Sequence, residues 1–365
     1  MKRRTPECDR ELTAAAHRGD LDTVQHLLDS GAHVNATTKN GRSALICAVI
    51  SGHARVVEAL VKYGASLAHP FISGNLALYV AISNGSADIV AHILSSPCLD
   101  IDRGLSHARG MASLRETLEI CGVAYCADWK KVCAPPLCQA ANEGSPQIIG
   151  MLLRKGAYAN ATDSDGATAL CIACRAGRRE VVSALLRGGA WVNGDLTSGV
   201  IPLEEAIKAN DAAIVKMLLD AGADRELGNP LAVAVCTHPG REIVDLLLRA
   251  GADKNAGVDP RVTPLQLAMA KGYIPASVAL AEAGASVHED FEDSLEVGEE
   301  MRRIILPIVA LRQVVFLFGT HPRMGKGSPI QLFAGFGWIT DFIISRSLPG
   351  WLIPSSKKDN MPELM

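Results

Sequence analysis

The chain has 365 residues, a formal net charge of −3 at pH 7 and 48% hydrophobic residues. This apolar fraction is large enough to build a core, which excludes a chain that is disordered throughout. The nearly balanced charge gives no indication of nucleic acid as a main partner, because nucleic-acid-binding domains usually present a basic surface.

A leucine recurs along the chain at a spacing close to 33 residues, and each one opens a short apolar segment. The eight leucines are Leu12, Leu45, Leu78, Leu137, Leu170, Leu203, Leu231 and Leu265. A fixed period of roughly 20–50 residues is typical of a repeat protein, in which each unit packs only against its neighbours. The period predicts an array of helical units over residues 9–288, after a polar tail at residues 1–8.

The unit that starts at Thr168 shows the pattern of one repeat. Thr168 is expected to cap a first helix over residues 169–174, and Gly177 to end it. Apolar residues at helical spacing over 181–186 predict a second helix with one buried stripe. Gly189 stands where a left-handed residue commonly ends a helix. Similar capping is expected before three other first helices, at Ser43, Asn229 and Thr263.

One gap in the period is too long. Leu78 and Leu137 are 59 residues apart, so residues 104–133 lie between three repeats at 9–103 and five repeats at 134–288. This segment is either a degenerate repeat or an insertion. Leu114 and Leu118 resemble a worn second helix, which favours the degenerate repeat.

Another gap is too short. Five residues are missing between Leu203 and Leu231 relative to the 33-residue period. The missing residues are expected to shorten the hairpin between Gly222 and Asn229.

The C-terminal region, residues 289–365, differs in composition from the repeats. An acidic linker at residues 289–300 is followed by aromatic-rich apolar runs at 304–318 and 329–344. Neither run provides the roughly 20 uninterrupted apolar residues of a membrane-spanning helix. The favoured role is a cap on the last repeat. A membrane contact through 304–344, a partner-binding or poorly ordered tail, and a gene-model artefact are the alternatives.

The cysteines indicate a reducing compartment. The chain has ten cysteines and its N-terminus has no apolar leader, which predicts a cytoplasmic protein, with a nuclear or membrane-associated location as the alternatives. Cys171 and Cys174 are expected to be core residues. Four cysteines in the irregular region are expected to be small buried thiols and, as an alternative, a zinc site. These four are Cys121, Cys126, Cys133 and Cys138.

Two sets of segments carry a family resemblance. Residues 263–268 read Thr-Pro-Leu-Gln-Leu-Ala and are followed by Gly-Ala at 284–285, while residues 31–36 and 40–45 form a hairpin and helix restart. These segments resemble the ankyrin repeat, with Gln266 where the family most often has His. The resemblance implies an all-α solenoid, a stack of helix–turn–helix units joined by β-hairpin or loop fingers, with an irregular C-terminal apolar tail.

The resemblance also implies where a partner would bind. Ankyrin proteins meet partner proteins on a concave face made of hairpin tips and the exposed ends of the first helices. The matching positions here are His17, Arg18, Lys39, Asn40, Arg42, Ile72, Ser73, Asn75, Asn142, Glu143, Ser164, Asp165, Arg175 and Lys208. The basic residues of the first two units favour an acidic segment of the partner.

The function expected from this resemblance is that of a non-catalytic scaffold or adaptor for protein–protein interaction, with a monomeric repeat domain. The histidines and acidic residues do not converge on a catalytic set, and no catalytic residue, metal or cofactor is predicted. A membrane-tethered scaffold, anchored through the apolar C-terminal region, is one alternative. A substrate-recruiting adaptor of a ubiquitin ligase is a second alternative, by analogy alone.

Overall fold

The computed structural model describes residues 6–38, 42–67, 76–96, 99, 101–102, 134–237, 240–257, 262–286 and 305. These residues form α-helices, and isolated β-bridges such as Thr37 with Ser43 and Thr162 with Thr168 close the bases of hairpins. The chain divides into two compact units, residues 1–223 and 224–365. Each unit is described by itself below.

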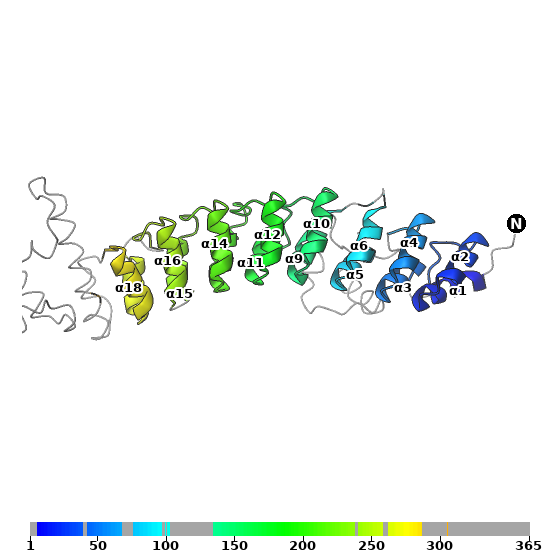
Figure 1. The fold of residues 1–365 in the computed structure, drawn as a ribbon, viewed down its shortest axis with the longest axis horizontal. Helices are drawn as coiled ribbons and strands as arrows, with labels where there is room; N and C mark the ends of the chain where they lie inside the picture. The colour runs from blue at the N-terminus through cyan, green and yellow to red at the C-terminus, as the bar shows by residue number, and fades with distance from the viewer. Residues whose placement is uncertain are drawn as a thin grey trace, which may run out of the picture. The chain divides into compact units, whose positions relative to one another are not determined.

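The described part of the first unit consists of helix pairs arranged in a row (Figure 1). Each pair is one repeat, with a first helix and an antiparallel second helix. The first helices are α1 (Pro6–Arg18), α3 (Ala44–Ile50), α5 (Leu76–Ser83), α9 (Pro136–Glu143), α11 (Ala169–Arg175) and α13 (Pro202–Lys208). The second helices are α2 (Leu21–Asp29), α4 (Ala54–Lys62), α6 (Ala87–Leu94), α10 (Pro146–Arg154), α12 (Arg179–Arg187) and α14 (Ala212–Asp220).

The predicted repeat register is confirmed by burial. Each of the eight recurring leucines exposes 2% or less of its surface. In the first unit each first helix packs against the first helix of the next repeat, and second helices pack in the same way. A polar residue caps many of the helices, as Thr168 does for α11 by accepting a hydrogen bond from the Cys171 amide at 3.4 Å. Gly189, with a φ of +85°, follows α12 as predicted.

The third and fourth helix pairs of the first unit are direct neighbours. Helix α9 packs against α5, and α10 packs against α6. The amide Nε2 of Gln139 in α9 donates hydrogen bonds to the backbone oxygen of Tyr79 at 3.1 Å and to Oγ of Ser83 at 2.7 Å. The two pairs are therefore stacked directly on each other, and the choice between a degenerate repeat and an insertion for residues 104–133 stays a prediction. Residues 103–133 themselves lie outside the described part of the chain.

Side-chain acceptors at the hairpins link consecutive repeats. In each case a side-chain oxygen of one repeat accepts a hydrogen bond from a backbone N–H that follows the second helix of the next repeat. The pairs are Asn35 with Ser66 (2.6 Å), Asp102 with Tyr158 (2.8 Å), Asn160 with Trp191 (2.7 Å) and, in the second unit, Asn255 with Ser286 (2.8 Å). These links were not predicted, because the partners are far apart in the sequence.

Replacing Asn160 by alanine is expected to lower the free energy of unfolding by about 1–3 kcal/mol. Asn160 is buried and its Oδ1 accepts from the Trp191 N–H at 2.7 Å, so the substitution removes this hydrogen bond and the packing of the amide group. Urea unfolding measures the loss, and hydrogen exchange at the Trp191 amide should accelerate. Ser164→Ala, on an exposed hairpin tip, should change stability by less than about 0.5 kcal/mol. Unchanged exchange at Trp191 would show that this link does not form in solution.

In the second unit, α15 (Pro230–Thr237) and α16 (Glu242–Arg249) form one described repeat, and α17 (Pro264–Ala270) and α18 (Ile274–Glu282) form the next. Thr263 caps α17 as predicted. Gln266 completes a capping box, because its Oε1 accepts from the Thr263 N–H at 2.8 Å while the Thr263 hydroxyl accepts from the Gln266 N–H at 3.3 Å. Gln266 thus has a structural role at the position where the family most often has His.

The boundary between the two units falls after Ala223, within the loop that the sequence predicts to be five residues short. Asn229, which was expected to cap α15, has a φ of +53°, a left-handed conformation, whereas Ser43 before α3 has an extended backbone. The cap at Asn229 stays a prediction.

The predicted C-terminal region is almost entirely outside the described residues. Ile305 is its one described residue, and it is helical and buried. The predicted cap and membrane contact at 304–344 therefore stay predictions. Among the helices that the structure describes, none is both long and apolar enough to cross a membrane.

Candidate protein-binding surface

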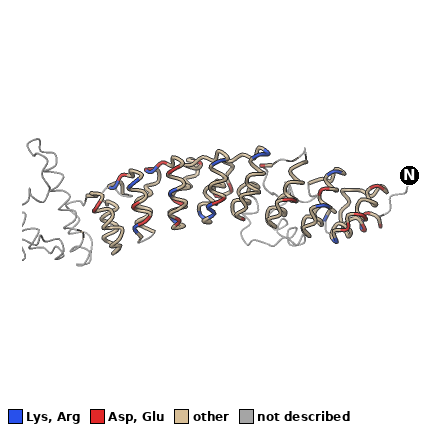
Figure 2. Tube along the Cα trace, in the orientation of Figure 1, with Lys and Arg blue, Asp and Glu red and all other residues tan. Residues whose placement is uncertain are grey.

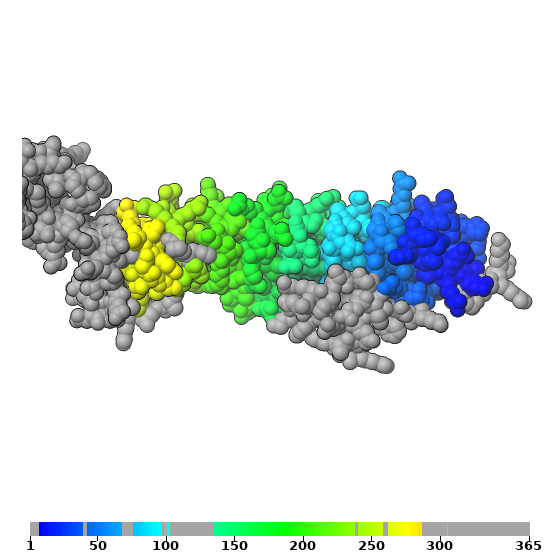
Figure 3. Space-filling view, turned by 90° about the horizontal axis from the view of Figure 1, so that it is seen from below, coloured from blue at the N-terminus to red at the C-terminus, as the bar shows by residue number. Residues whose placement is uncertain are grey.

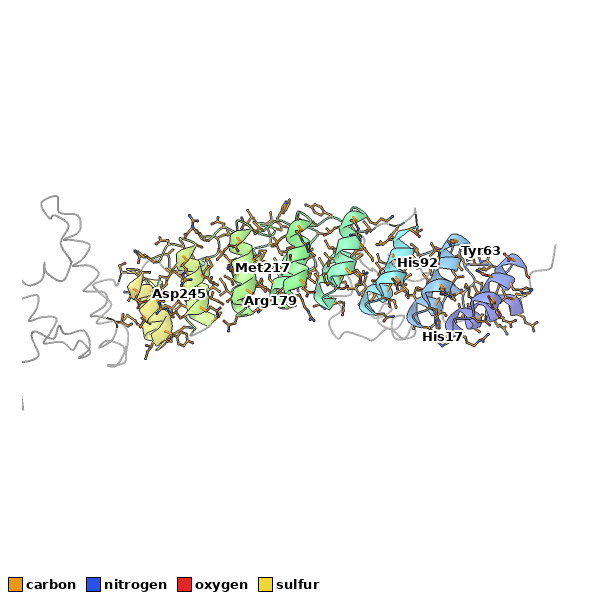
Figure 4. The ribbon with its side chains drawn as sticks, viewed as in Figure 1. His17, Tyr63, His92, Arg179, Met217 and Asp245 are labelled. Atoms are coloured by element: carbon orange, nitrogen blue, oxygen red, sulfur yellow. The ribbon has the colours of Figure 1, made fainter. Side chains whose placement is uncertain are left out.

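The candidate surface of the first unit lies where its first helices end and its second helices begin. His17 in α1 and Arg179 in α12 both lie at this end of the helix pairs, whereas Tyr63, after α4, lies at the opposite end (Figure 4). Figure 3 views the molecule from this end of the helix pairs. The helices from α1 to α4 form one continuous surface in this view, and the helices from α9 to α14 form another.

The first two repeats are joined at this surface through His17. The Nδ1 atom of His17 lies 2.7 Å from the hydroxyl of Ser51, and the backbone oxygen of His17 lies 3.1 Å from Nε2 of His53. His53 occupies the cap position of α4, but its side chain makes no cap hydrogen bond, because the ring reaches back to the preceding repeat over Gly19.

The hairpin tips of the second and third repeats are only partly described. Arg18 is exposed beside His17, as predicted. Arg42 was expected to be an exposed contact but is half-buried, since its backbone pairs with Thr38 at the hairpin base. The Nε atom of Arg42 is buried and has no acceptor in the described part of the chain. The other predicted residues of these tips, Lys39, Asn40, Ile72, Ser73 and Asn75, lie outside the described residues.

The middle of the surface is formed by the repeats of α9 and α11. Glu143 is exposed at the end of α9, next to the half-buried Asn142. Ser164 and Asp165 are exposed on a hairpin tip that Asp163 shapes, because its Oδ1 accepts from the amides of Asp165 and Ala167, each at 2.9 Å. The side chains of Glu143 and Ser164 are exposed at this part of the surface, and their contact with a partner stays a prediction.

Arg175 and Lys208 were predicted as contact residues, and both are engaged within the protein. The buried carboxylate of Glu205 in α13 bonds to Nε of Arg175 in α11 at 2.6 Å and to Nζ of Lys208 at 3.0 Å. Nζ of Lys208 also lies 3.2 Å from Glu204. Their charges are therefore largely neutralised, so they stabilise the junction of two repeats more than they attract a charged partner.

The environment of Glu205 determines its charge. Burial raises the pKa of the Glu205 carboxyl, but the hydrogen bonds and positive charges of Arg175 and Lys208 outweigh burial and place its pKa below the usual value. The hydrogen bond from Arg175 to Glu205 raises the pKa of that guanidinium in turn. Glu205 is therefore ionised at neutral pH.

Acid is expected to weaken this junction. A lowered folded-state pKa contributes stability above the unfolded pKa of about 4.3, and this stability is lost as the pH falls through the folded value. Wild type should therefore lose unfolding free energy more steeply than Glu205→Gln as the pH falls from about 5 to about 3. Ser164→Ala, which removes an exposed hydroxyl and no ionisable group, should follow the wild-type slope. Equal slopes for wild type and Glu205→Gln would contradict the ionised cluster.

Leu196 is a surface residue that the sequence interpretation missed. It exposes 66% of its surface on the hairpin before α13, the largest fraction among the exposed large hydrophobic side chains of the described residues. The carboxylate of Asp195 fixes this tip by accepting from the amide and hydroxyl of Thr197 at 3.0 and 2.7 Å. The sequence contains a pattern that could have identified Leu196 as a hairpin-tip residue, because it stands 33 residues, one repeat period, after Asp163 in the preceding hairpin tip.

Four of the six cysteines that the structure describes are buried, whereas Cys8 is half-buried and Cys236 is exposed. Cys171 and Cys174 are fully buried, which confirms their prediction as core. Burial raises the pKa of both thiols, and this disfavours the reactive thiolate. Cys138 is also buried, and its Sγ donates to the backbone oxygen of Ala161 at 3.3 Å. The other cysteines of the candidate zinc set, Cys121, Cys126 and Cys133, lie outside the described residues.

Comparison with known proteins agrees with this architecture. A family model for ankyrin repeats (3 copies) matches residues 12–103 and 137–229, slightly more than half of the chain. The Notch-regulated ankyrin repeat-containing protein of Xenopus tropicalis is 32% identical over 95 residues, which cover 25% of this chain and 83% of that protein.

Two further similarities differ in extent. The inactive serine/threonine-protein kinase TEX14 of Mus musculus is 29% identical over 86 residues, which cover 24% of this chain and 6% of that protein. The crystal structure of the ankyrin repeat domain of Bcl-3, a unique member of the IkappaB protein family, has a TM-score of 0.51 and 25% identity. That similarity covers 65% of this chain and 97% of the Bcl-3 chain. The chain therefore belongs to the ankyrin repeat family, whose repeats form a generally non-catalytic protein–protein interaction domain.

Proposed function

We propose that this protein is a non-catalytic scaffold or adaptor that binds a partner protein on the candidate surface, the predicted concave face. One observation carries the proposal: in the first unit α1, α3, α5, α9, α11 and α13 each pack against the next. Residues that stand one repeat apart in the sequence therefore lie side by side at the helix ends. A row of this kind offers a partner many adjacent positions whose side chains are not needed for packing.

The charges of this surface favour an acidic segment of the partner at the first two repeats. Arg18 is exposed there, and the guanidinium of an exposed arginine can form charge-assisted hydrogen bonds with a partner carboxylate, which are stronger than neutral ones. The cations farther along, Arg175 and Lys208, already have carboxylate partners.

The proposal is tested by capture followed by kinetics. Affinity capture from the native cells with mass spectrometry identifies the partner, and its association rate is then measured with the full chain. Arg18→Glu combined with Lys39→Glu should slow association at low salt, with little effect at high salt, because steering between exposed charges is screened. Lys216→Glu, at an exposed position in the middle of α14, should leave the rate unchanged. Equal rates for wild type and the double variant would contradict the acidic contact.

A membrane tether through residues 304–344 is the alternative prediction. It is tested by fusing residues 289–365 to a soluble reporter, which the tether would carry to membranes. If the reporter stays soluble while the full chain still captures its partner, the repeats act without an anchor of this kind.

A further inference from the structure

We propose a second binding site at the C-terminal ends of α10 and α12, for an acidic peptide segment that carries an apolar side chain. The site is the aromatic–basic patch, defined as Tyr158, Trp191, Arg154, Lys155 and Arg187. It differs from the surface of the proposed function and does not depend on it.

The patch lies at the end of the helix pairs opposite to the candidate surface. Second helices begin at the end where Arg179 lies and finish at the end where Tyr63 lies (Figure 4). Arg154 is the last residue of α10 and Arg187 the last of α12. Basic residues are visible at the end of α10 in Figure 2. A partner could therefore occupy this patch while another partner occupies the candidate surface.

The two aromatic rings form a fixed, half-exposed pair. The ring centroids of Tyr158 and Trp191 are 6.3 Å apart and the planes meet at 88°, an edge-to-face contact. Tyr158 exposes 51% of its surface and Trp191 exposes 52%. The backbone amides of Tyr158 and Trp191 donate hydrogen bonds to the side chains of Asp102 and Asn160, respectively. Both rings therefore lie on repeats that are linked to the preceding repeat. Rings held in place in this way lose little conformational freedom when an apolar side chain packs on them.

The composition of the patch is that of a binding site. Only 4% of the residues in this chain are aromatic, so two adjacent half-exposed rings are unusual here. Trp, Tyr and Arg are the residues most enriched among those that dominate binding energy at protein interfaces. Core packing does not explain the exposed half of either ring.

The charge of the patch selects an acidic ligand. Arg154, Lys155 and Arg187 are exposed, and none has an ion pair with a described residue. Nε of Arg187 instead donates to the backbone oxygen of Ser183 in its own helix. At the equivalent end of α4, by contrast, Lys62 is paired with Glu58 at 2.7 Å. The cations of the patch are thus available to carboxylates of a ligand.

The extent of the positive charge favours a peptide over a nucleic acid. Asp102 accepts a hydrogen bond from the Tyr158 amide on one side, and Asp220 takes the position of Arg187 on α14 on the other. The cations are therefore confined to two repeats between carboxylates, and a longer phosphate backbone would meet those carboxylates. A short acidic peptide matches this pattern of charges.

A phage-displayed library of random 12-residue peptides, selected on the full-length protein, tests the proposal. We expect enrichment of sequences rich in Asp and Glu around one large apolar residue. A synthetic peptide of the enriched sequence is then labelled and its Kd measured by fluorescence anisotropy. Trp191→Ser, and separately Arg154→Glu with Arg187→Glu, should each raise the Kd at least tenfold. Leu196→Ser and Lys216→Glu, at exposed positions outside the patch, should leave the Kd unchanged.

Three results would overturn the proposal. The first is that no enriched peptide depends on Trp191, although circular dichroism shows that the variants are folded. The second is that the enriched peptides lose binding with Ser164→Arg and not with the patch variants, which would place them on the candidate surface and support the proposed function instead. The third is that a 12-nucleotide oligo-dT binds in a Trp191-dependent manner as tightly as the peptide.

Discussion

Leu170→Ala is expected to lower the free energy of unfolding by about 2–5 kcal/mol, the usual cost of deleting most of a buried leucine side chain. Leu170 is fully buried in α11, whose neighbours are α9, α12 and α13. Because each repeat of an array is stabilised by the repeats beside it, the loss should extend to the adjacent helix pairs. Urea unfolding followed by circular dichroism measures the change, and hydrogen exchange shows how far it spreads.

Leu196→Ala is the matched control for Leu170→Ala. It removes the same atoms from a side chain that is 66% exposed, so stability should change by less than about 0.5 kcal/mol. A change of that small size for Leu170→Ala would mean that the repeat register is wrong.

Gly194→Ala is expected to cost about 2–5 kcal/mol, for two independent reasons. Gly194 has a φ of +70°, a left-handed conformation that costs other residues about 1–2 kcal/mol. A Cβ atom at this position would also lie 2.9 Å from the backbone oxygen of Val200 and 2.9 Å from Cδ of Pro202, and such overpacking typically costs about 1–3 kcal/mol. The hairpin before α13 would have to shift, and urea unfolding measures the cost.

Gly199→Ala separates the two reasons. Gly199 has the same φ of +70°, but a Cβ there would have no neighbour within 4 Å. It should therefore show only the conformational cost of about 1–2 kcal/mol. Equal losses for the two variants would show that the close approach at Gly194 is relieved without cost.

The sequence predicted those parts of the fold that depend on local chemistry. The leucine period, the cap at Thr168 and the glycine at 189 each follow from a few neighbouring residues. Because the units of the array are stacked, these local patterns recur at one spacing along the sequence. The register could therefore be found without a structure.

Features that depend on distant residues were missed. The hydrogen bonds from Gln139 to α5, which make the third and fourth pairs neighbours, join residues at least 56 positions apart. The links made by Asn35 and Asn160 span 31 residues. Nothing in the local sequence around such a residue identifies its partner in the next repeat.

The exposure of side chains on the candidate surface could be predicted better than the pairing of their charges. Matching the positions of one repeat to those of the next identified exposed residues such as Glu143 and Ser164, because helix ends and hairpin tips recur once in each repeat. It also counted Arg175 and Lys208 as contacts, although Glu205 pairs with both, with Arg175 from the next repeat and with Lys208 within α13. Exposure follows from the repeat pattern, whereas charge pairing depends on the residues that individual repeats happen to carry.

Site-specific photo-crosslinking in the native cells tests most directly whether the candidate surface binds a protein. A photoreactive amino acid replaces Ser164, on an exposed hairpin tip, or Lys216, at an exposed position in the middle of α14, in the full-length chain. We predict a discrete crosslinked partner from position 164 and none from position 216. The same partner from position 216 alone, or no partner from position 164, would contradict protein binding on this surface.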